Sequence, residues 1–245
     1  MCDDERIRRH FRRSLTTYDA NAAVQRGMAE TLAALLPARE YAAILEIGCG
    51  TGQLTRLLAG RFSCREYLAN DLVPECAAHL AGILPEARFL AGNIDGVAPQ
   101  LAHTRAGTFD LIISNACLQW SRRLPETLHA LRDCLTSGGV LAFSLFGQDN
   151  LREIRALFGA GLPTLTRDAL CALLPAGTVL TVHEEHCTLP FPSLLDALRH
   201  LKRTGVNAFG SAALSRRTLR ALEERFRTDY ARTLTYHPVY IVMQR

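Results

Sequence analysis

A glycine-rich segment has the residue types and spacing of a loop that binds a cofactor: Leu45-Glu46-Ile47-Gly48-Cys49-Gly50-Thr51-Gly52-Gln53. The apolar residues before it predict a buried strand, and the residues after it predict a helix. Glycines at such a turn let the backbone bend tightly and approach a ligand with no Cβ in the way. The dinucleotide pattern G-x-G-x-x-G is absent, because the sixth position counted from Gly48 is Gln53. The pattern that is present is E-x-G-x-G-x-G, from Glu46 to Gly52.

Polar residues end the next three predicted strands. Asn70-Asp71 ends the second strand, Gly92-Asn93-Ile94-Asp95 ends the third, and Ser114-Asn115 ends the fourth. In a parallel sheet the carboxyl ends of the strands share one edge, where ligands bind. An acidic side chain at position 71 can accept hydrogen bonds from both hydroxyls of a ribose. These positions therefore predict a ligand that lies across the strand ends.

The elements that position these residues alternate through the first 160 residues. Predicted strands at 42–47, 67–69, 88–91, 109–114 and 140–145 are interspersed with predicted helices at 53–59, 74–82 and 125–135. Such alternation predicts an α/β fold with a mostly parallel sheet and helices on both of its faces. Asn150-Leu-Arg-Glu153 has the pattern of a capping box that opens another helix.

The pattern changes in the last third of the chain. A strand is predicted at 178–187, amphipathic helices at 193–203 and 219–230, and a final strand at 234–243. Pro238 in the final strand favours an edge or bulged position. We expect one domain over residues 1–245, with an N-terminal helical cap (1–40), a cofactor-binding core (41–160) and, at 161–245, lid helices with the last two strands of a seven-stranded sheet.

Composition limits the possible function classes. The 245 residues are 48% apolar and carry a formal charge of +4, which is too small to indicate nucleic-acid binding by itself. The eight cysteines show no metal-ligand spacing, so we expect reduced thiols and no metal. The N-terminal residues are charged and lack the apolar region of a secretory signal, and no run approaches the roughly 18 apolar residues of a membrane span. We therefore expect a cytoplasmic protein that binds neither membrane nor nucleic acid.

The segment from Glu46 to Gly52 resembles motif I of the class I S-adenosylmethionine-dependent methyltransferases. The resemblance implies their Rossmann-like fold, S-adenosylmethionine as cofactor and S-adenosylhomocysteine as product. Family members often have Gly-Asp at the end of the third strand, where the carboxylate accepts from the adenine amino group; here Asn93 offers an amide oxygen instead. The implied cofactor-binding residues are Tyr18, Gln25, Glu46, Gly48, Cys49, Gly50, Gly52, Gln53, Asp71, Leu72, Asn93, Ile94, Ser114 and Asn115.

Four further segments, in the same order along the chain, resemble the malonyl-acyl-carrier-protein O-methyltransferases of biotin synthesis. They are residues 11–25, 115–120 (Asn-x-x-Leu-Gln-Trp), 143–155 and 198–207. The resemblance implies that a methyl group passes to the free carboxylate of a malonyl thioester, on carrier protein or coenzyme A. That carboxylate has a pKa of about 4 and is already ionised near neutrality, so no general base is required. Catalysis can then rest on alignment, with a lid that excludes water.

Candidates for positioning the malonyl group are the donors and cations Tyr18, Gln119, Arg155, Arg199 and Lys202. Trp120, the only tryptophan, is either a core anchor or, as we favour, part of a wall with Leu118 and Gln119 between the methyl donor and the acyl channel. An acidic carrier protein could bind arginines at 6, 8, 9, 12, 13, 216 and 217. We expect a monomer.

Two other function classes remain open from the sequence. One is a different small-molecule methyltransferase that acts on carbon or on another carboxylate. The other is a cofactor-binding module without catalysis, which would keep the glycine loop and Asp71.

Overall fold

Seven strands form one sheet in the computed structural model, which describes residues 4–159, 161, 164–206 and 215–245. In sheet order they are β3 (Arg88–Ala91), β2 (Glu66–Asp71), β1 (Ala43–Ile47), β4 (Phe109–Asn115), β5 (Leu135–Phe146), β9 (Pro238–Gln244) and β6 (Thr178–Glu184). The first five pair in parallel, and β9 runs antiparallel to both β5 and β6. The predicted mostly parallel, seven-stranded sheet is confirmed.

Helices cover both faces of this sheet because successive strand residues point to opposite sides. On one face, Ile44 and Leu111 pack with α2 (Ala23–Ala34), α3 (Gln53–Arg61) and α4 (Cys76–Ile83). The opposite face packs against α5 (Ile94–Thr104), α6 (Leu124–Cys134) and α8 (Arg167–Cys171). The sequence analysis did not predict α5, whose N-cap is the Asn93 side chain, accepting from the backbone N–H of Asp95 at 2.9 Å.

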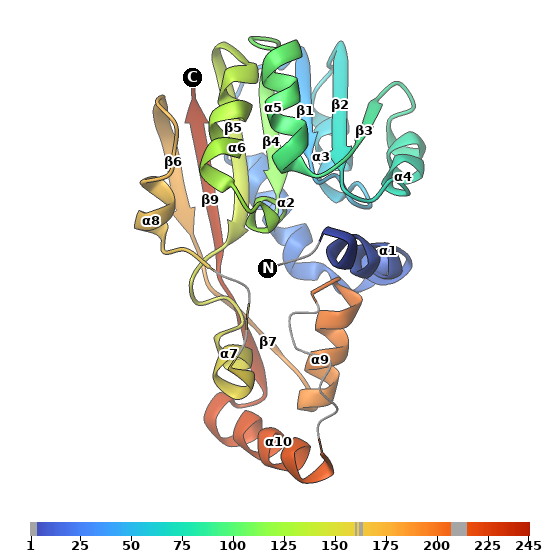
Figure 1. The fold of residues 1–245 in the computed structure, drawn as a ribbon, viewed down its shortest axis with the longest axis vertical. Coiled ribbons are helices and arrows are strands. Elements are labelled where there is room, and N and C mark those ends of the chain that lie inside the picture. Colours follow the sequence, from blue (N-terminus) through green and yellow to red (C-terminus); the bar gives the residue numbers. More distant parts are fainter. Residues whose placement is uncertain (1–3, 160, 162–163, 207–214) are drawn as a thin grey trace.

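A smaller layer lies beyond the carboxyl ends of the parallel strands (Figure 1). It contains α7 (Arg152–Phe158), α9 (Leu194–Arg203), α10 (Arg216–Tyr230) and a two-stranded sheet of β7 (Cys187–Pro190) and β8 (Thr233–Tyr236). Each of the two late predicted strands is therefore divided between two sheets.

Pro238 does not occupy the predicted edge. It is the first residue of β9, which lies between β5 and β6. A proline donates no backbone hydrogen bond, and the first position of a strand tolerates that loss best.

The predicted capping box at Asn150 is also wrong. The residue before α7 is Leu151, with a φ of 52° and no side-chain cap. The Asn150 amide oxygen accepts from the backbone of His237 at 3.4 Å, and the buried Glu153 carboxylate accepts from the backbone of Thr235 at 2.9 Å. Because Asn150 and Glu153 accept from the backbone of His237 and Thr235, neither side chain caps α7.

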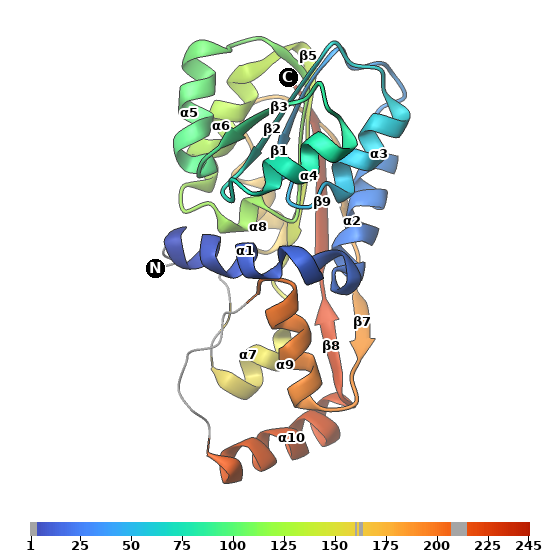
Figure 2. The ribbon, with the colours of Figure 1, turned by 90° about the vertical axis from the view of Figure 1, so that its right-hand side faces the viewer.

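The first helix, α1 (Asp4–Asn21), lies across the carboxyl ends of the parallel strands (Figure 2). The C-terminal end of α9 packs against it: Thr17 Oγ1 donates to the carbonyl of Arg203 at 3.4 Å, and Gly205 lies against the Phe11 ring, where a Cβ would come within 2.8 Å of it. The expected cap and one expected lid helix therefore meet. No helix in the described part of the chain has the length and apolar character that a bilayer crossing needs.

Candidate functional site

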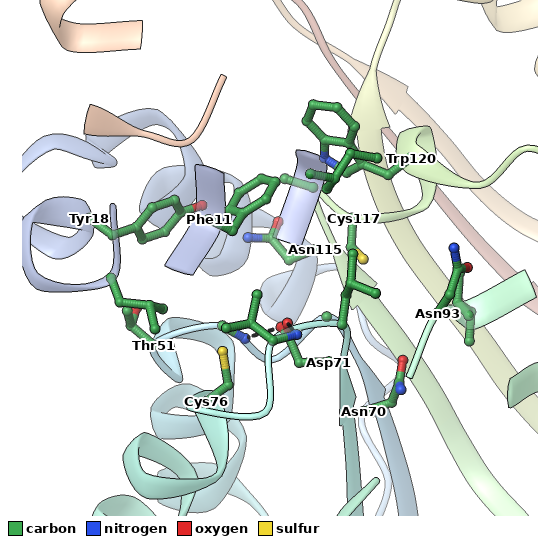
Figure 3. Close-up of a pocket in the computed structure, with 18 of the residues that line it drawn as sticks. Phe11, Tyr18, Thr51, Asn70, Asp71, Cys76, Asn93, Asn115, Cys117 and Trp120 are labelled. Atoms are coloured by element: carbon green, nitrogen blue, oxygen red, sulfur yellow. Dashed lines mark hydrogen bonds between the residues drawn. The ribbon is translucent and has the colours of Figure 1, made fainter. Parts of the chain in front are cut away.

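A pocket lies between α1 and the carboxyl ends of the parallel strands (Figure 3). Its open space, part of which is continuous with solvent, amounts to ≈ 850 Å³. Its lining comes from five segments: 7–18, 48–51, 70–76, 92–94 and 115–120. The predicted site residues that line it are Tyr18, Gly48, Gly50, Asp71, Leu72, Asn93, Ile94, Asn115 and Trp120.

The glycine loop adopts backbone conformations that other residues rarely take. Gly48, Gly50 and Gly52 have φ of 73°, 53° and 83°. A Cβ on Gly48 would also lie 2.4 Å from Cys117 Sγ, so this position requires glycine twice over. At Gly48 and Gly50 the loop thereby presents backbone, without a side chain, to the pocket.

Asp71 connects this loop to the second strand end. Its carboxylate accepts from the backbone N–H of Gly50 at 2.9 Å and of Val73 at 2.8 Å. Burial raises the pKa of Asp71, and these hydrogen bonds oppose the shift. Because Asp71 lines the pocket, its carboxylate oxygens can also accept from hydroxyl groups of a ligand.

Asn93 and Asp4 attach the start of α1 to the third strand end. The Asn93 amide donates to Asp4 at 2.6 Å, while its oxygen caps α5. The second carboxylate oxygen of Asp4 accepts from the Arg122 guanidinium at 2.7 Å. Sequence reasoning missed Asp4, because nothing local indicates that the first turn of the chain returns to β3.

The other end of α1 is held by Asp19. Its carboxylate accepts from Thr51 Oγ1 at 2.6 Å and from Gln53 Nε2 at 2.9 Å. Beside it, the Tyr18 ring points into the pocket (Figure 3), and burial together with the Asp71 charge raises the pKa of Tyr18. Tyr18 and Asp19 thus have different roles: the tyrosine lines the pocket, and the aspartate fixes the helix to the glycine loop.

Trp120 lies in a short 3₁₀ turn, η1 (Leu118–Trp120), and lines the pocket. Its ring meets that of Phe11 edge-on, with centroids 5.6 Å apart. Leu118, by contrast, is fully buried in the core, and Gln119 donates to the carbonyl of Ala116 at 2.7 Å. Within the described structure, Gln119 Oε1 is a buried acceptor with no hydrogen-bond partner. Of the proposed wall, Trp120 is therefore the residue that faces the ligand space.

Asp95 positions the loop that carries Trp120. Its buried carboxylate accepts from Thr127 Oγ1 at 2.9 Å, from the backbone N–H of Arg122 at 2.8 Å, and from the hydroxyl of Ser121. The sequence analysis noted Asp95 in the third strand end but gave it no role, because its partners come from another segment.

Several expected cofactor residues support the pocket from beneath. Glu46 is 1% exposed and accepts from Thr55 Oγ1 at 2.7 Å and from the Tyr67 hydroxyl. Burial raises the pKa of Glu46 to about 7, against the opposing effect of these hydrogen bonds. Others outside the pocket lining are Gln25, Cys49, Gly52, Gln53 and Ser114.

The structure does not bring the three expected cations to the pocket. Arg155 on α7 donates to Thr164 Oγ1 at 3.1 Å and to the carbonyl of Gln148. Arg199 forms an exposed ion pair with Asp196 at 3.0 Å. Lys202 is exposed, and its charge acts on His10 of α1. The segment 198–207, singled out in the sequence, is described as far as residue 206, and Asn207 lies outside the described residues.

The cysteines around the pocket are neutral thiols near pH 7. Burial raises the pKa of Cys49 and Cys76 well above the usual value, and it raises that of Cys117 to about 12. None of the three therefore supplies a thiolate. Seven cysteines are free in the described structure; Cys2 lies outside it.

Comparison with known proteins supports the interpretation of this geometry. A family model described as a methyltransferase domain matches residues 20–217. A malonyl-[acyl-carrier protein] O-methyltransferase of Chlorobium luteolum is 34% identical over 261 residues, covering 100% of this chain and 97% of that protein. One of Prosthecochloris aestuarii is 36% identical and covers 98% of this chain and 92% of that protein.

The fold is also that of solved methyltransferases. The structure of an S-adenosylmethionine-dependent methyltransferase from Mesorhizobium loti aligns with a TM-score of 0.58 at 15% identity, over 90% of this chain and 100% of that one. At that identity the likeness shows the fold alone. The family match, the two relatives and the pocket at the strand ends together establish that this chain is an S-adenosylmethionine-dependent O-methyltransferase and belongs to the malonyl-[acyl-carrier protein] O-methyltransferase family.

Proposed function

We propose that this chain methylates the free carboxylate of a malonyl group carried on acyl-carrier protein, forming the methyl ester as an early step of biotin synthesis. The names of its relatives support the substrate class. We further propose that it acts as a cytoplasmic monomer and that malonyl-coenzyme A is an alternative substrate.

The residues of the pocket fit S-adenosylmethionine. The side-chain-free loop at Gly48 and Gly50 can approach the cofactor closely, and Asp71 can accept from the ribose hydroxyls. Asn93 and Ile94 would hold the adenine end, and Asn115 would lie at the methionine end. The cofactor, when bound, supplies an electrophilic methyl group on a sulfonium.

The composition of the pocket wall carries the proposal. Among the described residues that line it there is no histidine, lysine or glutamate, and the thiols of Cys76 and Cys117 are neutral. Apart from Asp71, whose carboxylate accepts from the backbone of Gly50 and Val73, such a pocket offers no obvious base for a protonated acceptor, and an ionised carboxylate requires none. The chain therefore has to align the acceptor and exclude water, which Phe11, Tyr18 and Trp120 can do as an apolar wall.

A basic surface beside the pocket suits an acidic carrier protein. Exposed arginines follow one another along α1 at positions 6, 8, 9, 12 and 13. The charges of Arg9, Arg13, Arg6 and Lys202 add to burial in lowering the pKa of His10, so Lys202 of α9 faces the same surface. Two further exposed arginines, 216 and 217, begin α10, which lies at the end of the smaller layer away from α1 (Figures 1 and 2). The concentration of positive charge would steer an acidic partner toward the pocket.

A mass-spectrometric assay tests the proposal. The protein and S-adenosylmethionine are incubated with malonyl-carrier protein, malonyl-coenzyme A or free malonate, with acetyl-carrier protein as the control that lacks a free carboxylate. We expect one added methyl mass on the malonyl carrier and none on the acetyl carrier. Methylation of unrelated acids only would contradict the proposed substrate. Cofactor binding with no methylated product from any acceptor would contradict the proposal that the protein is an enzyme.

A further inference from the structure

Three side chains with metal-ligand chemistry meet at a site separate from the cofactor pocket. Asp149 follows β5, His186 lies between β6 and β7, and His237 lies between β8 and β9. At His186 and at His237 the chain passes between the seven-stranded sheet and the two-stranded sheet, whereas Asp149 lies in the loop before α7. We call Asp149, His186 and His237 the junction cluster. None of the three lines the cofactor pocket.

The distances within the junction cluster approach those of a ligand set. Asp149 Oδ2 lies 3.1 Å from His186 Nε2 and 3.8 Å from His237 Nδ1, and one ligand atom of each residue lies within 4.8 Å of the others. Metal bonds of about 2.0–2.2 Å place tetrahedral ligand atoms about 3.3–3.6 Å apart. The His186 and His237 rings are stacked, with centroids 4.0 Å apart and planes at 21°, so the exposed His186 ring would have to turn before both nitrogen lone pairs could point at one ion.

His237 is held in an orientation suited to a ligand. Its Nε2 lies 3.3 Å from a carboxylate oxygen of Glu184, and its Nδ1 accepts a 3.2 Å hydrogen bond from the backbone N–H of Asp149. Nδ1 therefore carries the lone pair that a metal needs, and the ion would replace that weak hydrogen bond. A carboxylate on the second imidazole nitrogen is the usual support of a metal-bound histidine.

Packing and exposure suit the same role. The His237 side chain is 3% exposed, and it is confined by Gly147, where an added Cβ would lie 2.7 Å from the ring. The side chains of His186 and Asp149 are 47% and 39% exposed, so an ion can enter from solvent on their side. One rigid ligand and two accessible ones form a site that is partly preorganised and open to exchange.

We propose that Asp149, His186 and His237 bind a divalent transition-metal ion such as Zn²⁺, with Glu184 orienting His237. Two imidazoles and one carboxylate favour zinc over magnesium or calcium, which prefer oxygen ligands. The ion would join the loop before α7 to both strand crossings, and so fix the two sheets to each other. Its role would be structural, because the cluster does not reach the cofactor pocket.

Titration of the full-length, chelator-treated protein with ZnCl₂ in a calorimeter tests this proposal, without reference to methyl transfer. We expect one ion to bind per chain. His186→Ala and Asp149→Asn should each weaken binding at least tenfold, and Glu184→Gln about 10–100-fold, as loss of a supporting carboxylate does. The exposed His183 on β6, whose ring stacks on Tyr240, lies outside the cluster, so His183→Ala should leave the affinity unchanged.

Absorption of the Co²⁺-substituted protein identifies the ligand atoms, because thiolate ligands add an intense near-ultraviolet band. We expect the visible bands of cobalt bound to nitrogen and oxygen, lost in His186→Ala. The metal-free variants should melt within a few degrees of the metal-free parent. A loss of metal affinity in a variant can then be assigned to the lost ligand and not to unfolding. No saturable one-to-one binding, equal affinity in His186→Ala, or a thiolate band that persists in that variant would each overturn the proposal.

Discussion

The Phe11 ring meets the Trp120 ring edge-on, at 90° and with centroids 5.6 Å apart. Phe11 comes from α1 and Trp120 from the turn after β4, and both line the cofactor pocket (Figure 3). Edge-to-face pairs of this kind contribute about 0.5–1.5 kcal/mol beyond the area that they bury. The contact therefore holds α1 against the far wall of the pocket.

Trp120→Ala should impair methyl transfer more than cofactor binding. Loss of the ring opens the wall that aligns the acceptor, and misplacement by about 1 Å can cost roughly 100-fold in rate. We expect kcat/KM for malonyl-carrier protein to fall about 10–100-fold, while the Kd of S-adenosylmethionine changes less than about fivefold. Trp120→Phe, which keeps an aromatic face, serves as the control. Equal losses of both, with a much lower melting temperature, would instead make Trp120 a core residue.

Asp4→Ala should accelerate release of the cofactor. Asp4 joins α1 to Asn93 at 2.6 Å and to Arg122 at 2.7 Å, and the ion pair is about two-fifths exposed on each side. Exposed pairs contribute about 0–1 kcal/mol, so we expect a two- to tenfold faster dissociation in stopped-flow measurements. Asp4→Asn can still accept a hydrogen bond from Asn93, so its dissociation rate should lie between those of the parent and Asp4→Ala. Dissociation at the parental rate in Asp4→Ala would show that this contact does not restrain α1.

Asp71→Ala should weaken binding of S-adenosylmethionine about 100-fold by calorimetry. The proposed hydrogen bonds to the ribose involve a charged acceptor, and each contributes about 1.5–3 kcal/mol. Glu46→Gln is the informative comparison, because Glu46 bonds to Thr55 and Tyr67 beneath the pocket. We expect its Kd to stay within about threefold of the parent. A reversed order of the two variants would mean that Glu46 is the ribose ligand.

Glu46 should also make stability depend on pH. Burial raises the pKa of Glu46 from an ordinary 4.5 to about 7, so the folded protein binds more protons than the unfolded chain between these values. The stabilisation is complete below pH 4.5 and is lost as the pH rises through 7. Relative to Glu46→Gln, the free energy of unfolding should fall by about 3 kcal/mol over this range in urea titrations. A constant difference across that range would contradict the raised pKa.

Charge reversal on α1 should affect the carrier substrate selectively. Arg8 and Arg9 are exposed, and replacing both with glutamate should raise KM for malonyl-carrier protein about 10-fold while leaving that for malonyl-coenzyme A nearly unchanged. The effect should shrink as salt is added. Arg65→Glu is a matched control, because this exposed arginine precedes β2 at the amino ends of the strands. Equal changes for both substrates would place the carrier elsewhere.

The sequence by itself determined the features that depend only on residues close together along the chain, namely the strands and the tight turns. Strand periodicity and turn residues predicted β1, β3 and β4 to within a residue or two, and the spacing of Gly48, Gly50 and Gly52 predicted the tight turn between β1 and α3. Such features follow from which side chains alternate and which backbone angles each residue allows. The carboxyl ends of parallel strands share one edge, so Asp71 and Asn93 could be assigned to one pocket.

Tertiary structure alone decided where distant segments meet. The packing brings Asp4 into hydrogen-bond contact with Asn93, and Asp19 with Thr51 of the glycine loop. It also pairs Glu153 with the backbone of Thr235, so that Glu153 does not cap its helix, and it places Arg155 beside Thr164, outside the pocket. It also assembled the junction cluster from the loop before α7 and two strand crossings, whose three residues are far apart in the sequence. Periodicity and turn chemistry act over a few residues, whereas these contacts depend on strand register and on the packing of helices over the whole sheet.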